Sequence, residues 1–119
     1  MQCCCMQPDL QLLVDILAAA DDVLAFSCAL DLPAFTTQKA TRYAILHSLT
    51  IIGEASGRLS ENFREHHSEI PWRRIIAFRH RIVHGYGELD LELVWEVTVR
   101  LVPQLRVQVA SIMEQISRI

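Results

Sequence analysis

The sequence predicts an all-α fold, an up-and-down bundle of four to five helices. Apolar residues recur at three- and four-residue intervals, and only four glycines and four prolines interrupt the 119 residues. No strand pattern, internal repeat or low-complexity linker is present. Because 51% of the residues are hydrophobic, we predict one domain over residues 1–119 with a single core, in which residues 1–7 form a frayed lead-in.

The first helix is predicted to run from Asp9, a candidate N-cap, to Leu30. Its apolar content wraps widely around the axis, so more than one face can be covered. The residues at helical spacing are Leu10, Leu13, Val14, Leu17 and Leu24. Pro33 cannot continue a helix and restricts Leu32, which places a break at residues 31–33.

The second helix is predicted over residues 37–65, with Thr36 or Thr37 as its cap. One apolar stripe follows from the spacing and consists of Tyr43, Ala44, His47, Ile51, Ala55, Leu59 and Phe63. Gly53 and Gly57 lie inside this helix. Since glycine destabilises a helix interior by up to about 1 kcal/mol relative to alanine, the two glycines indicate a close crossing with another helix.

Three further segments complete the bundle. Residues 70–72 open a third helix that ends near Val83 or His84, followed by a glycine-containing loop. Asp90 caps a fourth helix, and Pro103 then forces a kink or a short break. The last helix runs to residue 119 with a three-four repeat that indicates bundle core more than a dimer seam: Leu105, Val109, Ile112, Ile116 and Ile119.

The composition excludes several classes of protein. The formal net charge of -3 provides no overall attraction to nucleic acid, so an RNA partner requires a local basic patch. Cys3, Cys4, Cys5 and Cys28 match neither a disulfide framework nor a zinc finger, which favours a reducing cytoplasm. The start of the chain lacks the features of a signal peptide, and no apolar run reaches the roughly 18 residues that a membrane span needs.

The chain is locally basic between residues 64 and 84. This segment contains five arginines against two acidic residues, Glu65 and Glu69, and the arginines are Arg64, Arg73, Arg74, Arg79 and Arg81. The segment has two interpretations, a solvated helix face or a patch that attracts phosphates. In the second interpretation Arg73, Arg74 and Arg81 are the candidate phosphate contacts.

Arg79 and His84 are the candidate catalytic residues within that segment. Five positions correspond to about 140° around a helix, so the two side chains converge only if the helix ends at His84 or a partner chain completes the site. The alternative is a surface arginine and a histidine favoured by the helix dipole. His80 and His84 have metal-ligand spacing, but no further ligand stands at a convincing offset, and we predict neither a metal nor a cofactor.

Two other residues have competing interpretations. Glu54 can form a helical ion pair with Arg58, four residues later, or can reach the Arg79/His84 region as a supporting carboxylate. Tyr86 lies between two glycines, where it can pack its ring over the loop or expose its hydroxyl to another enzyme.

The pattern Arg79-x4-His84-x-Tyr86 resembles the motif of HepT-like toxins in the HEPN superfamily. Three other segments are similar to that family: residues 51–55 (IIGEA), residues 69–72 (EIPW), and Val94-Trp95 with the later Pro103 and Leu105. The similarity covers about residues 9–105, and the order and spacing of its pieces make it specific. The resemblance implies a HEPN-like helical bundle that forms a homodimer or a larger homo-oligomer.

The resemblance also implies a function, the toxin of a type VII-like toxin–antitoxin system that acts as a metal-independent endoribonuclease on RNA. Carried over, Arg79 holds the scissile phosphate, His84 transfers protons, and a nucleotidyltransferase antitoxin transfers AMP to Tyr86. His80 departs from the asparagine common in the family, which makes it a supporting residue of open role. The alternative function is a non-catalytic partner of a nucleotidyltransferase that binds nucleotide or phosphate through Arg79.

Overall fold

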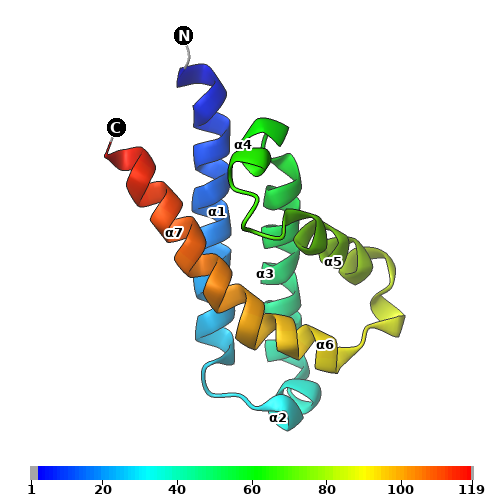
Figure 1. Cartoon of the computed structure of the whole chain (residues 1–119). Helices are drawn as coiled ribbons and strands as arrows, with labels where there is room; N and C mark the ends of the chain where they lie inside the picture. Colours follow the sequence, from blue (N-terminus) through cyan, green and yellow to red (C-terminus); the bar gives the residue numbers. More distant parts are fainter. Residues whose placement is uncertain (1–2, 119) are drawn as a thin grey trace.

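The computed structural model describes the backbone of residues 3–118 and the side chains of residues 8–85 and 87–118. Residues 3–118 are mostly helical and contain no strand (Figure 1). The α-helices are α1 (Cys3–Ser27), α2 (Leu32–Thr37), α3 (Lys39–Arg58), α4 (Glu61–His66), α5 (Trp72–His84), α6 (Leu91–Glu96) and α7 (Val102–Ser117). A 3₁₀ turn, η1, spans Tyr86–Glu88, and a π-helical turn, η2, spans Val97–Leu101.

The long helices pack in the order α7, α1, α3 and α5, so that α1 contacts both α3 and α7 while α5 contacts α3 (Figure 1). α2 lies at the end of the bundle opposite the two termini, and α6 continues through η2 into α7 (Figure 1). This arrangement confirms the predicted all-α bundle. It also places α5, the helix that carries the motif, at the side of the molecule.

The core is built from three-four repeats on the packed helices. α1 contributes Leu13, Ile16, Ala20 and Val23, all fully buried or nearly so. α7 contributes the predicted repeat, of which Leu105, Val109 and Ile112 are buried; Ile119 lies outside the described residues. Leu10 and Val14, which the sequence places at helical spacing with Leu13, are exposed.

The predicted apolar stripe of the second helix is confirmed only in part. Ala55 and Leu59 are buried, whereas Tyr43 and His47 are exposed. The buried face of α3 consists of Ile45, Leu46, Ser48, Leu49, Ile52, Gly53, Ala55 and Ser56. Two helical registers overlap in this segment, and both contain apolar residues at three-four spacing. The neighbours α1 and α5 determine which register is buried, because burying the larger apolar area gives the greater stabilisation.

The start of the first helix differs from the prediction. α1 begins at Cys3, so residues 3–7 belong to the helix and Pro8 lies inside it. Pro8 removes one backbone donor near the helix start without ending the helix. Asp9 is therefore not an N-cap of α1. Its carboxylate instead accepts hydrogen bonds from the backbone N–H of Ser60 at 2.9 Å and from the Ser60 hydroxyl at 2.7 Å.

The predicted second helix is interrupted at both ends. Its first residues belong to the short helix α2, where the Asp31 carboxylate accepts from the N–H of Ala34 and caps the helix. Thr36 and Thr37 donate to the Pro33 carbonyl instead of capping α3, which begins at Lys39. The C-terminal part separates as α4, because Ser60 accepts from the N–H of Phe63 and starts a new helix.

The last two predicted helices are joined. Asp90 caps α6 as predicted, accepting from the N–H groups of Glu92 and Leu93. Pro103 causes no break, because the turn before it widens and the N–H of Val102 donates to the Val97 carbonyl five residues earlier. A π-helical turn of this kind absorbs the proline ring and its missing donor. None of the described helices is long and apolar enough to cross a membrane.

Candidate active site on α5

Local signals determine where the motif helix begins and ends. Pro71 precedes the first helical residue, and the indole N–H of Trp72 donates to the His67 carbonyl at 3.0 Å, which ties the start of α5 to the end of α4. At the other end, the N–H of Gly85 donates to the Arg81 carbonyl at 2.8 Å. The helix therefore ends at His84, as predicted, and the histidine occupies its last turn.

Arg79 lies on the side of α5 that crosses α3. A Cβ placed on Gly53 would overlap the Cβ and Cγ of Arg79 and would come within 3.3 Å of the Ile75 carbonyl. Gly53 therefore permits the close crossing that the glycines of this helix predicted. The Nε of Arg79 is buried without a hydrogen-bond partner, so the guanidinium retains a donor for a group that can reach it.

His84 lies elsewhere around the same helix, together with His80. The two imidazole rings have centroids 4.4 Å apart, with an angle of 46° between their planes. Since residues five apart are about 140° apart on a helix, His84 and Arg79 leave α5 in different directions. Although the helix ends at His84, no hydrogen bond joins the two side chains among the described residues of the chain.

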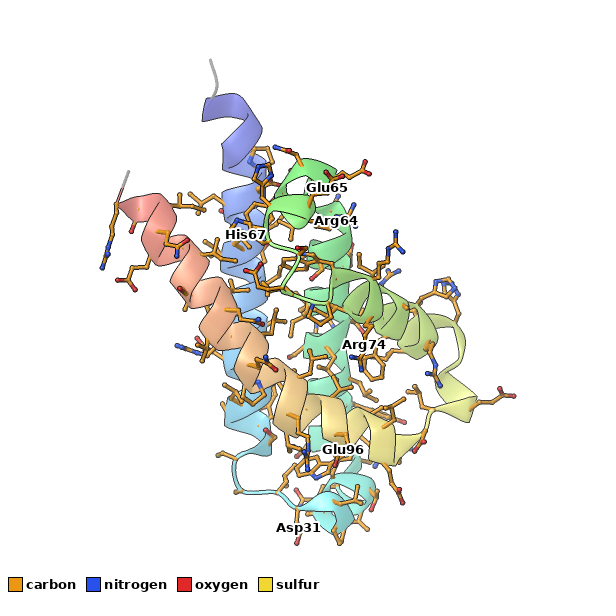
Figure 2. The ribbon with its side chains drawn as sticks, viewed as in Figure 1. Asp31, Arg64, Glu65, His67, Arg74 and Glu96 are labelled. Carbon is orange, nitrogen blue, oxygen red and sulfur yellow. The ribbon has the colours of Figure 1, made fainter. Side chains whose placement is uncertain are left out.

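A basic groove runs along the outer face of α5 beside the two histidines. One section, of about 600 Å³, is lined by Arg64, Arg73, Ile76, Ala77, His80 and Arg81. The next section, of about 680 Å³, shares Arg64 and Arg73, adds Arg74, and is also lined by two carboxylates, Glu61 and Glu65. Figure 2 shows that Arg64 comes from α4 and Arg74 from α5. The groove therefore combines the predicted phosphate contacts with an arginine from a different helix.

The arginines of this groove form no ion pair among the described residues, although Glu61 and Glu65 line the same groove. The ion pairs of the described residues are His67–Glu69, Arg100–Glu96, Arg106–Asp21 and Arg118–Glu114. None of them involves Arg64, Arg73, Arg74 or Arg81, and the Nε of Arg64 is buried without a hydrogen-bond partner. Guanidinium groups that lack an ion-pair partner are suited to bind phosphates.

The remaining predicted residues lie apart from this groove. Glu54 is exposed on α3 next to the crossing, and the described ion pairs do not include the expected pair with Arg58. The backbone of Tyr86 begins the η1 turn directly after the motif helix. The side chain of Tyr86 is not among those that the structure describes, so both interpretations of its hydroxyl remain predictions. Within the described residues, no three His, Cys, Asp or Glu side chains form a group that could hold a metal ion.

Sequence reasoning counted Arg64 among the local arginines but did not assign it to the phosphate patch. Its position depends on the break at Ser60, which turns α4 back over the start of α5. The serine followed by Glu61 was the available signal, because Ser is a preferred N-cap and acidic residues favour the first turn. The apolar spacing that continues to Phe63 obscures this signal, because it favours one uninterrupted helix.

Comparison with known proteins identifies the same resemblance independently. A family model described as "Ribonuclease HepT-like" matches residues 16–112. "Putative RNase MJ1380" of Methanocaldococcus jannaschii is 36% identical over 97 residues, which is 82% of this chain and 89% of that protein. "Probable ribonuclease HepT" of Thermococcus cleftensis is 32% identical over 94 residues, 79% of this chain and 86% of that protein. No solved structure shows a significant match.

Proposed function

The chain belongs to the HepT-like ribonuclease family, and from this premise we propose that it is the toxin of a toxin–antitoxin pair that cleaves RNA without a metal. The observation that carries the proposal is the groove of unpaired arginines beside His80 and His84. An acidic protein with net charge -3 needs such a local basic surface to attract an RNA strand.

In the proposed reaction, Arg79 and His84 act on one phosphodiester. Arg79 binds a non-bridging oxygen of the scissile phosphate and stabilises the charge that develops there. His84 removes the proton from the ribose 2′-hydroxyl or delivers one to the leaving oxygen, the general acid–base role that histidine serves best near neutral pH. His80 supports His84 through the contact between their rings, and Glu54 lies beside the crossing that positions Arg79.

We propose that a second copy of the chain brings the two groups together. An apolar groove of about 430 Å³ lies between α3 and α5 and is lined by Tyr43, Leu46, His47, Thr50, Ile82 and Val83. Val83 is one turn beyond Arg79 on the same face of α5 and is 44% exposed. A symmetric dimer across this groove would place the Arg79 of one protomer near the His84 of its partner.

The antitoxin in this proposal is a nucleotidyltransferase that transfers AMP to the Tyr86 hydroxyl. Tyr86 immediately follows the end of the motif helix, in a short 3₁₀ turn after Gly85. A bulky anion attached there would stand beside His84 and repel RNA phosphates, which explains how a modification at this position neutralises the toxin. The toxin, its antitoxin and the RNA substrate would meet in the cytoplasm.

Cleavage of RNA by the purified protein in EDTA tests the enzymatic proposal. We expect His84→Ala to lower the cleavage rate by at least about 100-fold, because a general acid or base contributes 10²–10⁴-fold. His66→Ala is the matched control, since His66 is an exposed histidine on α4 that does not line the groove. Equal cleavage by wild type and His84→Ala, with unchanged circular dichroism, would remove His84 from the reaction.

The divergence of Arg79 and His84 within one chain favours a second candidate function, a non-catalytic partner that holds nucleotide for a nucleotidyltransferase. The intact mass after incubation with the partner and ATP separates the two. Added AMP on wild type, absent from Tyr86→Phe, supports the modified toxin. A stable complex without added mass, together with no RNA cleavage, supports the non-catalytic partner.

A further inference from the structure

A cavity of about 300 Å³ lies between α3, α5, α6 and the π-helical turn η2. Its walls are mainly apolar. They include Leu49 and Ile52 of α3, Phe78 of α5, Leu93 of α6 and Val97 of the π-helical turn. None of these residues takes part in the chemistry proposed for Arg79 and His84, so the proposed reaction does not account for the cavity.

Two arginines also line this apolar cavity. Arg74 and Arg81 are seven residues apart on α5, two turns along the same face, and neither belongs to a described ion pair. Apolar walls with two unneutralised guanidinium groups suit a ligand that is flat and apolar at one end and anionic at the other. A volume near 300 Å³ is at the small end of ligand sites, which fits one ring system better than a large molecule.

The cavity is continuous with the basic groove. Ala77 and Arg81 line both of them, and Arg74 lines the cavity and the second section of the groove. A nucleotide whose base enters the cavity therefore leaves its phosphate at the arginines that follow the outer face of α5. RNA-binding proteins commonly hold an unstacked base in this way, with the base against an aromatic ring and the phosphate against arginine.

We propose that this cavity binds one nucleobase of the RNA strand that occupies the groove. The base packs against Phe78 and the apolar wall, while Arg74 and Arg81 bind the adjoining phosphate. The inference rests on the proposed RNA-cleaving function and adds to it a site that selects the nucleotide next to the cleavage position. A base without a phosphate would contact only Phe78 and the apolar wall, and a phosphate without a base would contact only the two arginines.

Binding of small ligands to the His84→Ala protein tests this site without turnover. The probes are the four nucleoside 3′-monophosphates, the unphosphorylated nucleosides and ribose 5-phosphate, each titrated while backbone amide shifts are recorded. We expect at least one nucleotide to shift the amides of Ala77, Leu93 and Val97, and to bind at least tenfold more tightly than ribose 5-phosphate. An RNA hexanucleotide should bind more tightly still, since the groove contacts its other phosphates.

Two tryptophan variants make the matched comparison. Leu93 of α6 is 37% exposed and lines the cavity. Val99 lies in the π-helical turn that follows α6, is 39% exposed and does not line the cavity. Leu93→Trp should fill the mouth of the cavity and weaken nucleotide binding at least tenfold, while Val99→Trp should leave it unchanged. If Leu93→Trp does not fold, the amide shifts of the parent protein still decide the question.

Several results would overturn the base site. Equal affinity for nucleotide and ribose 5-phosphate would mean that the arginines bind phosphate alone, and equal affinity for the mononucleotide and the hexanucleotide would point to a free nucleotide as the ligand. A change in oligomeric state with Leu93→Trp, without nucleotide-dependent shifts, would show that a second copy covers the cavity. If the wild type cleaves RNA but nucleotides cause no such shifts, the base site is wrong and the proposed ribonuclease function is unaffected. If nucleotides cause these shifts but the wild type does not cleave RNA, the ribonuclease function is wrong and the base site is unaffected.

Discussion

The Cβ of Arg79 occupies the space that a side chain on Gly53 would need, so α3 and α5 approach each other closely where the candidate phosphate-binding residue leaves its helix. A residue with a side chain at position 53 must push the helices apart or move the arginine. Gly57, one turn later, differs, because a Cβ there would meet the Cγ1 of Ile76 at an ordinary 3.8 Å. The two glycines of α3 therefore have different roles.

Gly53→Ala should destabilise the protein even though alanine favours helix by about 1 kcal/mol. We expect a net loss of about 1–3 kcal/mol in the free energy of unfolding, the usual effect of forcing an extra methyl group into a packed crossing. Urea denaturation followed by circular dichroism measures it. Gly57→Ala is the control and should be neutral or up to about 1 kcal/mol stabilising. Similar stability changes for both variants would contradict the close crossing.

Mixing two inactive variants tests whether the site spans two subunits. If the Arg79 of one protomer works with the His84 of its partner, a heterodimer of Arg79→Ala and His84→Ala contains one intact site and one doubly defective site. Refolding equal amounts together should restore about a quarter of the wild-type RNA cleavage, since half of the dimers are mixed and half of their sites are intact. Each variant refolded alone is the control. A mixture as inactive as its components would place both residues in one chain's site.

The arginines of the basic groove should determine how RNA binding responds to salt. In the His84→Ala background, Arg73→Ala and Arg81→Ala should each weaken binding of a single-stranded RNA and reduce the slope of log affinity against log salt by about 0.7. Fluorescence anisotropy over a range of potassium chloride concentrations gives the slope. Arg118→Ala is the control, because Arg118 already pairs with Glu114 at 2.6 Å on α7. An unchanged slope in the groove variants would mean that RNA does not follow α5.

His80 should act by positioning His84. Because the centroids of the two rings are 4.4 Å apart, His80→Ala removes a packing surface from the imidazole that we propose transfers protons. We expect roughly a tenfold fall in RNA cleavage, smaller than that of His84→Ala, with most of the fall in kcat. His80→Asn introduces the asparagine that is common at this position in the HepT-like family. It should retain at least half of the wild-type rate of RNA cleavage. A loss as large as that of His84→Ala, without recovery by asparagine, would make His80 a proton-transfer group itself.

The helical class, the bounds of the motif helix and the residues of the motif can be predicted from the sequence, because they depend on local signals. Pro71 and Gly85 lie at the two ends of α5, and Asp90 caps α6 through the N–H groups of its first turn. Capping residues, prolines and glycines act on the backbone within a few residues. Their effects can therefore be predicted from the sequence alone.

The faces by which the helices pack cannot be predicted in this way, because they depend on contacts between segments far apart in the chain. In α3 two apolar registers overlap, and packing against α1 and α5 buries Ile45 and Ile52 while Tyr43 stays exposed. Packing also sets Arg79 against Gly53, brings Arg64 from α4 over α5, and closes an apolar cavity beside Phe78. Periodicity shows that a segment is helical, but the rotation of each helix about its axis follows from the total area that its neighbours bury together.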